Sequence, residues 1–349
     1  MRRGGGVRLM GAQIAVPAPL RNSALLGLGV HRPERIVTND EICEQIDSSD
    51  EWIQSRSGIK ERRFAEQHPK ESVVDMATSS AEQALTAAGL TGAQIDTVIV
   101  ATSTYPYQTP QAAALVADRI GTGGAAALDI QAGCAGFCYA LGVASDLVRA
   151  GTAEHVLVVG VERMSDTTEP TDRSVRFIFG DGAGAVVVGP SDEVGVGPTV
   201  WGSDGSQANA IRQEPDWVDF ATNPNQKRPW IIMEGTAVFR WAAFEMSKYA
   251  RQIADKAGVA LEDLDAFVPH QANLRINDVI VKQLELPETV AVADDIIETG
   301  NTSAASIPLA MEKMLRTGQV EVGSTALLLA FGAGLSYAGQ VVKMPPLAK

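Results

Sequence analysis

Short apolar runs alternate with helical patterns along most of the chain. Several runs have the length and the β-branched content of buried strands: DTVIVATS (96–103), HVLVVGVE (155–162) and GAGAVVVG (182–189). Segments between them, such as PQAAALVADRIG (110–121), carry apolar residues at helical spacing. Because strands that alternate with helices form βαβ units, the pattern predicts an α/β protein with a largely parallel sheet covered by helices on both faces.

Two short helices are predicted near the N-terminus from their cap residues. Asn39 and Asp40 are expected to form the N-cap of the first helix, over EICEQI. The segment 48–50 is expected to cap the second, over EWIQSRSG, which Gly58 is expected to end.

The order of these elements recurs in the second half of the chain. Three landmarks return in the same order and at nearly the same spacing: the residue that opens a strand, the residue that begins a helix and the glycine that ends this helix. In the first half they are Asp96, Cys134 and Gly151, and in the second half Asp265, Asn301 and Gly318. Matching order and spacing predict an internal duplication.

Each half then continues with an apolar strand and a glycine-rich segment that we expect to be a hairpin, FGDGAGAVVVG (179–189) and FGAGLSYAGQVV (331–342). The segment 190–229 has the Gly, Pro, Asp and Asn content of a connector with loops. The expected organisation is a flexible leader (1–22), an N-terminal half (23–190) and a C-terminal half (191–349).

Composition and charge narrow the class of protein. Apolar residues make up 45% of the 349 residues, and no run approaches the roughly 18 apolar residues of a membrane span. The net charge of −13 argues against nucleic acid or an anionic membrane as the main partner. Three cysteines cannot form a disulfide framework for this length, so we expect a reducing compartment, the cytoplasm.

The stretch DIQAGCAGFCYALG (129–142) places Cys134 where a strand leads into an apolar helix. A thiol at a helix N-terminus lies near unpaired backbone amides and the positive end of the helix dipole, and both favour the thiolate of a nucleophile. Cys134 could equally be a small buried residue. Cys138, one turn later, is expected to serve packing.

His270 is the one histidine of four that follows an apolar strand and enters a loop of small and polar residues, VPHQANLR. When the two halves are aligned by their repeated elements, His270 falls near Cys134 and Asn301. The ends of parallel strands, where such residues lie, commonly form binding and catalytic sites. Asn301 could also be a helix cap, and the glycines of FGAGLSYAG could serve a tight turn or expose N–H groups for an oxyanion hole.

Taken together, six motifs closely resemble the β-ketoacyl-acyl carrier protein synthase III family of the thiolase superfamily. The motifs are SSDEWIQSRSGIKERR, AGCAGFCYAL, FGDGAGAVVVG, VPHQANLRI, TGNTSAASIPLA and FGAGLSYAG. The resemblance runs from about Ser23 to the C-terminus and implies a thiolase-like duplicated fold, two similar α/β halves in a layered αβαβα arrangement.

The resemblance also implies the chemistry. Cys134 would accept an acyl primer from acyl-CoA, and His270 with Asn301 would promote decarboxylative condensation with malonyl carried by an acidic acyl carrier protein. The backbone N–H groups of Cys134 and Ala333 would form the oxyanion hole; relatives often have glycine at the second position. No metal or redox cofactor is implied, and a homodimer is expected.

Substrate contacts follow from the same resemblance. Trp52 and Arg173 would sandwich the adenine of CoA, with Arg56 near its phosphates. Thr109 would limit the acyl pocket across the dimer interface; because some relatives have phenylalanine there, its small side chain predicts room for branched or longer primers. Carrier-protein docking is expected at three cations, Arg240, Arg275 and Lys282.

Three other functions stay open at the level of sequence. A priming ketosynthase of a polyketide pathway would use the same chemistry with a different carrier protein. A Cys/His/Asn hydrolase would use the same residue types, although the duplicated plan and the apolar helix at Cys134 disfavour it. A non-catalytic binding module is disfavoured because all three reactive residues are present.

Overall fold

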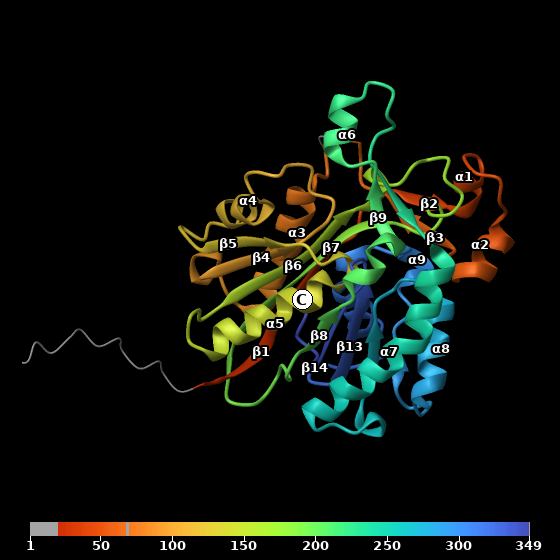
Figure 1. The fold of residues 1–349 in the computed structure, drawn as a ribbon. Coiled ribbons are helices and arrows are strands. Elements are labelled where there is room, and N and C mark those ends of the chain that lie inside the picture. The colour runs from red at the N-terminus through yellow and green to blue at the C-terminus, as the bar shows by residue number, and fades with distance from the viewer. Residues whose placement is uncertain (1–19, 68–69, 349) are drawn as a thin grey trace, which may run out of the picture.

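The structure is a computed structural model that describes residues 20–67 and 70–348. Residues 1–19, most of the expected leader, lie outside the described residues. Two five-stranded sheets dominate the fold, the first drawn in red to yellow-green and the second in green to dark blue in Figure 1. No helix in the described part of the chain combines the length and the apolar character needed to cross a bilayer.

The two sheets share one pattern of strand pairing. The first sheet has the order β1-β7-β6-β4-β5 and the second the order β12-β11-β13-β14-β8. Its strands are β1 (Asn22–His31), β4 (Thr97–Ala101), β5 (Ala126–Ile130), β6 (Val156–Arg163) and β7 (Asp181–Ser191) in the first sheet, and β8 (Val200–Ser203), β11 (Ala266–Pro269), β12 (Ala291–Val292), β13 (Thr325–Gly332) and β14 (Ser336–Lys343) in the second.

In both sheets the pairs on one side are parallel and those on the other are antiparallel. The prediction of a largely parallel sheet is therefore wrong, because the last long strand of each half, β7 or β14, runs back antiparallel along its predecessor, β6 or β13. The predicted duplication is confirmed by the repeated order.

Helices form three layers around the two sheets. The outer helices are α3 (Val73–Ala88) and α4 (Ala112–Arg119) on the first sheet, and α7 (Gly235–Ala257) and α8 (Leu274–Leu284) on the second. The helices α5 (Gly136–Arg149) and α10 (Ser306–Arg316) lie between the sheets, within one continuous core that includes both. This arrangement confirms the layered αβαβα fold.

The smaller elements gather at one end of the sandwich. They are β2 (Ile36–Thr38), α1 (Asn39–Cys43), α2 (Asp50–Ser57), β3 (Glu61–Arg63), β9 (Ile211–Glu214), α6 (Trp217–Thr222), β10 (Trp230–Met233) and α9 (Ile296–Thr299). The segment 190–229 is therefore more than a connector, since it supplies an edge strand and part of a hairpin.

The cap residues of the two predicted N-terminal helices are partly as expected. Ser49 caps α2, and Gly58 ends it with φ at 80°. The N-cap of α1 is Thr38, whose side chain accepts from the backbone N–H of Glu41, so the assignment of Asn39 and Asp40 as the cap is wrong by one residue. Asn39 instead turns inward toward Arg62.

The two glycine-rich segments differ in conformation. Residues 331–342 form the expected β13–β14 hairpin, but residues 179–189 are not a hairpin, because they lead into the single long strand β7. The glycines of β7 serve close packing instead. A Cβ at Gly184 would lie 2.6 Å from Pro308 Cβ, so this glycine lets α10 lie directly on the strand.

Arg62 of β3 is fully buried and has no carboxylate partner among the described residues. Its guanidinium donates to Val37 O (3.1 Å), Asn39 Oδ1 (2.7 Å) and Phe177 O (2.8 Å). Burial lowers the pKa of Arg62 to about 10. Because two acceptors lie in the adjoining β2 and α1 and the third precedes β7, this side chain ties the small elements to the segment that leads into β7.

Replacing Arg62 by alanine is expected to lower the free energy of unfolding by about 3 kcal/mol or more, since three buried acceptors lose their donor and a cavity opens. Arg62→Lys keeps the charge but cannot reach all three acceptors and is expected to fall in between. Urea unfolding followed by circular dichroism measures both. Arg63→Ala, at the half-buried next position, is the matched control, and an equal loss there would contradict the assignment.

Candidate active site

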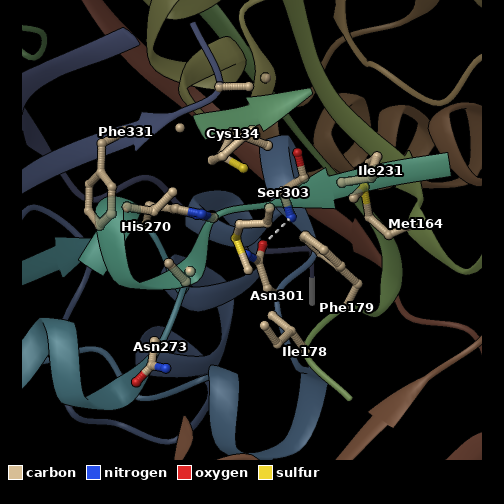
Figure 2. A pocket seen from close by; sticks show the side chains of 18 of the residues that line it. Cys134, Met164, Ile178, Phe179, Ile231, His270, Asn273, Asn301, Ser303 and Phe331 are labelled. Atoms are coloured by element: carbon tan, nitrogen blue, oxygen red, sulfur yellow. Dashed lines mark hydrogen bonds between the residues drawn. The ribbon is translucent and has the colours of Figure 1, made fainter. Parts of the chain in front are cut away.

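One cavity of about 770 Å³ brings together residues from both halves of the chain. Cys134, His270 and Asn301 all line it, and Figure 2 shows their side chains facing a shared space. Cys134 lies in a short 3₁₀ turn before α5, His270 directly after β11, and Asn301 directly before the turn that leads into α10. The duplicated fold therefore places the three residues singled out from the sequence at one site.

The backbone around Cys134 is packed tightly against the end of β13. A Cβ at Gly332 would lie 3.0 Å from Cys134 N and 3.1 Å from its Sγ. A Cβ at Gly133, whose φ is 51°, would lie 3.2 Å from Ala333 N. Glycine at these two positions lets the N–H groups of Cys134 and Ala333, the expected oxyanion donors, belong to the same wall of the cavity.

Burial, with a smaller contribution in the same direction from the nearby Glu162 carboxylate, raises the pKa of the Cys134 thiol to about 12. The expectation that the helix N-terminus yields a resting thiolate is therefore contradicted, because desolvation of the sulfur outweighs the opposing effects. Cys134 is a thiol at neutral pH in this structure, and its proton must leave when the sulfur is acylated.

His270 is neutral and its ring orientation is set by a hydroxyl. Only 1% of the residue is exposed, and burial lowers its pKa to about 3. Its Nδ1 lies 2.6 Å from Ser306 Oγ, and the ring packs edge-on against Phe331 with centroids 5.4 Å apart.

The hydrogen bonds of Ser306 assign the tautomer of His270. The Oγ of Ser306 accepts from the backbone N–H of Gln271 at 3.4 Å, and no other acceptor for its own hydrogen lies within reach among the described residues. The Ser306 hydroxyl therefore donates to Nδ1, which leaves the proton of the neutral imidazole on Nε2. His270 thus offers the cavity an N–H donor.

Asn301 is oriented by a backbone donor. The N–H of Ser303 donates to Asn301 Oδ1 at 2.8 Å, so the amide presents its Nδ2–H₂ group on the other side. The backbone of Asn301 is also held, because its N–H donates to Ile178 O and its carbonyl accepts from Gly180 N–H. Both polar groups next to Cys134 are therefore positioned donors.

Two of the three expected CoA contacts, Trp52 and Arg56, line the cavity. The third, Arg173, has its guanidinium 4.7 Å from the Trp52 ring centroid. At this distance Arg173 stacks directly on the indole, so the two groups meet without room for a base between them. An adenine sandwiched there requires the exposed Arg173 side chain to swing away.

The three expected docking cations are all exposed, with Arg240 on α7 and Arg275 and Lys282 on α8. Arg275 also lines the cavity and lies over the Phe239 ring, 5.6 Å from its centroid. Thr109, by contrast, is exposed in the loop after β4 and does not line the cavity of its own chain.

Sequence reasoning missed three polar residues of the site: Ser303, which lines the cavity, and Glu162 and Ser306, which do not. Glu162 is fully buried at the end of β6, where its carboxylate accepts from Ser303 Oγ at 3.0 Å. A glutamate that closes the apolar run HVLVVGVE was the available signal, because a charged residue in a buried strand needs a reason. The two serines carried no signal beyond their place in the motif around Asn301.

Two family profiles match the chain. One, described as 3-oxoacyl-[acyl-carrier-protein (ACP)] synthase III, matches residues 128–205, which include Cys134. The other, described as the C-terminal part of the same synthase, matches residues 254–344, which include His270 and Asn301.

Solved structures share the fold along nearly the whole chain. The priming β-ketosynthase from the R1128 polyketide biosynthetic pathway is 46% identical, with a TM-score of 0.93 over 96% of this chain and 100% of that one. The 3-oxoacyl-[acyl-carrier-protein] synthase III of Aquifex aeolicus is 37% identical, with a TM-score of 0.84 over 92% of this chain and 100% of that one.

Curated relatives are closer in sequence. The mycobacterial β-ketoacyl-[acyl-carrier-protein] synthase III of Mycolicibacterium paratuberculosis is 56% identical over 96% of this chain and 99% of its own length. The β-ketoacyl-[acyl-carrier-protein] synthase III of Mycobacteroides abscessus is also 56% identical, over 96% of this chain and 98% of its own length. By its sequence, its fold and the residues gathered in its cavity, the chain belongs to the β-ketoacyl-[acyl-carrier-protein] synthase III family.

Proposed function

We propose that this chain transfers an acyl primer from acyl-CoA to Cys134 and condenses it with malonyl-acyl carrier protein, releasing CoA and CO₂ and giving a β-ketoacyl-carrier protein. The observation that carries the proposal is the cavity in which a thiol faces two oriented, neutral N–H donors, from His270 and Asn301. Relatives that are 56% identical and named for this synthase activity support it.

In the first half-reaction the Cys134 sulfur attacks the thioester carbonyl of acyl-CoA. The negative charge that develops on the carbonyl oxygen needs donors that are already in place, and the N–H groups of Cys134 and Ala333 share the wall where this oxygen would lie. The C–S bond of the CoA thioester then breaks, which leaves acyl-Cys134.

In the second half-reaction the malonyl thioester loses CO₂. The electron pair of the broken C–C bond delocalises onto the thioester oxygen, and the resulting enolate is stabilised by Nε2–H of His270 and Nδ2–H of Asn301. The enolate carbon attacks acyl-Cys134 and releases the cysteine. These steps draw on side chains and the two thioesters and require no metal or redox cofactor.

We assign the remaining contacts to the two substrates. Trp52, Arg56 and a displaced Arg173 suit the adenine and phosphates of CoA, because an indole face stacks and a guanidinium pairs with phosphate. A local cationic patch lets an acidic carrier protein approach a chain of net charge −13. We assign this patch to Arg240, Arg275 and Lys282.

A homodimer is supported by the exposed edge of the first sheet. β5 forms this edge and leaves one row of backbone groups without a strand partner in the described chain, with Leu128 36% exposed. Pairing of β5 with its copy would cover the edge. We propose that the loop containing Thr109 then reaches the acyl pocket of the partner subunit.

The proposed pathway is initiation of fatty acid synthesis, in the cytoplasm, where the three free cysteines would stay reduced. A second candidate is polyketide priming, favoured by the TM-score of 0.93 to the R1128 priming ketosynthase. Product formation with a fatty-acid carrier protein and with a polyketide carrier protein, compared under the same conditions, separates the two.

Variants of the three site residues are expected to separate the half-reactions. Cys134→Ala should give no acyl adduct when intact mass is measured after exposure to acyl-CoA. His270→Ala and Asn301→Asp should still form the adduct, but they should release CO₂ from malonyl-carrier protein about 10²–10³-fold more slowly, because each loses one enolate donor. Malonyl-independent thioester hydrolysis by the unaltered protein would instead support a hydrolase.

The buried, neutral His270 predicts a specific pH dependence. Since its pKa falls from 6.5 unfolded to about 3 folded, the unfolded state binds more protons between these values, and the free energy of unfolding should decrease as the pH falls below about 6.5. In His270→Asn this decrease should be smaller. Urea unfolding at stepped pH values measures both, and parallel curves for the two proteins would contradict a depressed histidine pKa.

Primer selectivity is expected to be graded. With threonine at position 109, isobutyryl-CoA and hexanoyl-CoA should also serve as primers, at rates that differ by degrees from that of acetyl-CoA, because one methylene discriminates by only about 1–3 kcal/mol. Thr109→Phe should slow the longer primers selectively. Initial rates with malonyl-carrier protein test this, and strict acetyl preference in the unaltered protein would refute the assignment of Thr109 to the pocket.

A further inference from the structure

Glu162 is a buried carboxylate that the reaction described above does not use. It lies at the end of β6, is 0% exposed, and takes part in no ion pair among the described residues. Isolated charges are rarely retained in an interior unless something depends on them, because desolvation of a charge costs several kcal/mol.

Hydrogen-bond donors surround the carboxylate. Oε2 accepts from the Ser103 backbone N–H (3.0 Å), Thr104 Oγ1 (2.7 Å) and Thr102 Oγ1 (3.4 Å). Oε1 accepts from Ser103 Oγ (2.9 Å) and from Ser303 Oγ (3.0 Å). Four of these donors come from the loop after β4, and the fifth, Ser303, comes from the other half of the chain.

Ser303 connects Glu162 to the nucleophile. Its hydroxyl donates to Glu162, and the same side chain lines the cavity beside Cys134, as Figure 2 shows. The residue has a positive φ of 50° although it is not glycine, a conformation that the surrounding contacts must hold. Ser303 Oγ therefore lies between the Cys134 thiol and Glu162 Oε1, to which it is hydrogen-bonded.

The thiol proton needs such a path. Because Ser306 donates to Nδ1 of His270, the Nε2 of this histidine already carries a proton and cannot accept one. Asn301 is not a base. Burial raises the pKa of Glu162, which brings its basicity closer to that of the buried thiol than an exposed carboxylate would be.

We propose that Glu162 accepts the proton of Cys134 through the Ser303 hydroxyl during primer transfer and returns it after condensation. This inference rests on the proposed function of the same site. Glu162 acts through Ser303 and does not touch the substrate.

As the Sγ–C bond forms to the acyl carbon, the Sγ–H proton moves to Ser303 Oγ and the Ser303 proton moves to Glu162 Oε1. The CoA sulfur leaves with the electron pair of the broken C–S bond and takes a proton from water. When condensation later expels Cys134 as a thiolate, the proton on Glu162 returns through Ser303 to Sγ, so one proton from water is consumed per turnover.

The proton transfer also suits the second substrate. While Glu162 is protonated, the acyl-enzyme holds no buried negative charge beside Cys134. The malonyl carboxylate and the enolate that follows it then meet less repulsion in a cavity of low dielectric. This proton relay, from Cys134 through Ser303 to Glu162, therefore links acylation of Cys134 to the binding of the anionic malonyl group.

A merely electrostatic or structural role predicts the opposite result for one substitution. The Glu162 carboxylate raises the pKa of the Cys134 thiol, so removing its charge alone should make the thiol more acidic and primer transfer faster at neutral pH. Glu162→Gln keeps the shape and an oxygen that accepts from Ser303 but cannot take a proton. Loss of the relay should make primer transfer slower.

The experiment measures single-turnover acylation of Cys134 by an acyl-CoA primer that loads the unaltered protein, using intact mass in quenched flow. Glu162→Gln is expected to slow acylation by about 10²-fold, the typical contribution of a positioned base. A decrease under tenfold, or any increase, overturns the proposal. Thr104→Val, which removes a donor to Glu162 outside the relay, is the matched control, with acylation expected within tenfold of the unaltered rate.

A second variant keeps the test decisive if Glu162→Gln does not fold. Ser303→Ala leaves the carboxylate in place but interrupts the path, and it should slow acylation to a similar degree. The double variant should be no slower than the slower single variant, because both remove one route. Additive losses would overturn the proposal, whereas failure of the unaltered protein to be acylated by any acyl-CoA would refute the proposed function itself.

Discussion

The site depends on how closely two helices approach the sheets between which they lie. α5 and α10 fill the middle layer, and small residues set their distance from the strands. A Cβ at Gly160 would lie 2.3 Å from Ala304 O, and one at Gly136 would lie 3.1 Å from Ala101 Cβ. Because these contacts leave no room for larger side chains, the turns that begin the two helices meet at a fixed separation, and Cys134 and Asn301 reach one cavity with them.

Burial in this cavity decides the protonation of its groups. The pKa of Cys134 is raised, that of His270 is lowered and that of Glu162 is raised, each chiefly by desolvation. Charge must therefore be created during the reaction and met by donors that are already oriented. The serines at 303 and 306 provide this orientation, since one holds Asn301 and the other holds His270.

Much of the fold could be predicted from the sequence because its signals are local or periodic. Apolar runs, cap residues such as Ser49 and the repeated spacing around Cys134 and Asn301 indicated a duplicated α/β protein, and the motifs indicated its family. The predictions were wrong where a local sequence pattern is compatible with two conformations. The glycines of 179–189 suggested a turn, but they lie in or beside β7, where Gly184 allows contact with Pro308 across the layers.

The sequence by itself determined which reactive residues the chain carries and the order in which its two halves present them. Only the tertiary structure decided their chemical states: the hydrogen on Nε2 of His270, the protonated thiol of Cys134 and the link from Glu162 to Ser303. These states depend on desolvation and on contacts between residues distant in sequence, 36 positions for His270 and Ser306 and 141 for Glu162 and Ser303. No local sequence pattern indicates either, because both arise only when distant segments of the chain fold around the same cavity.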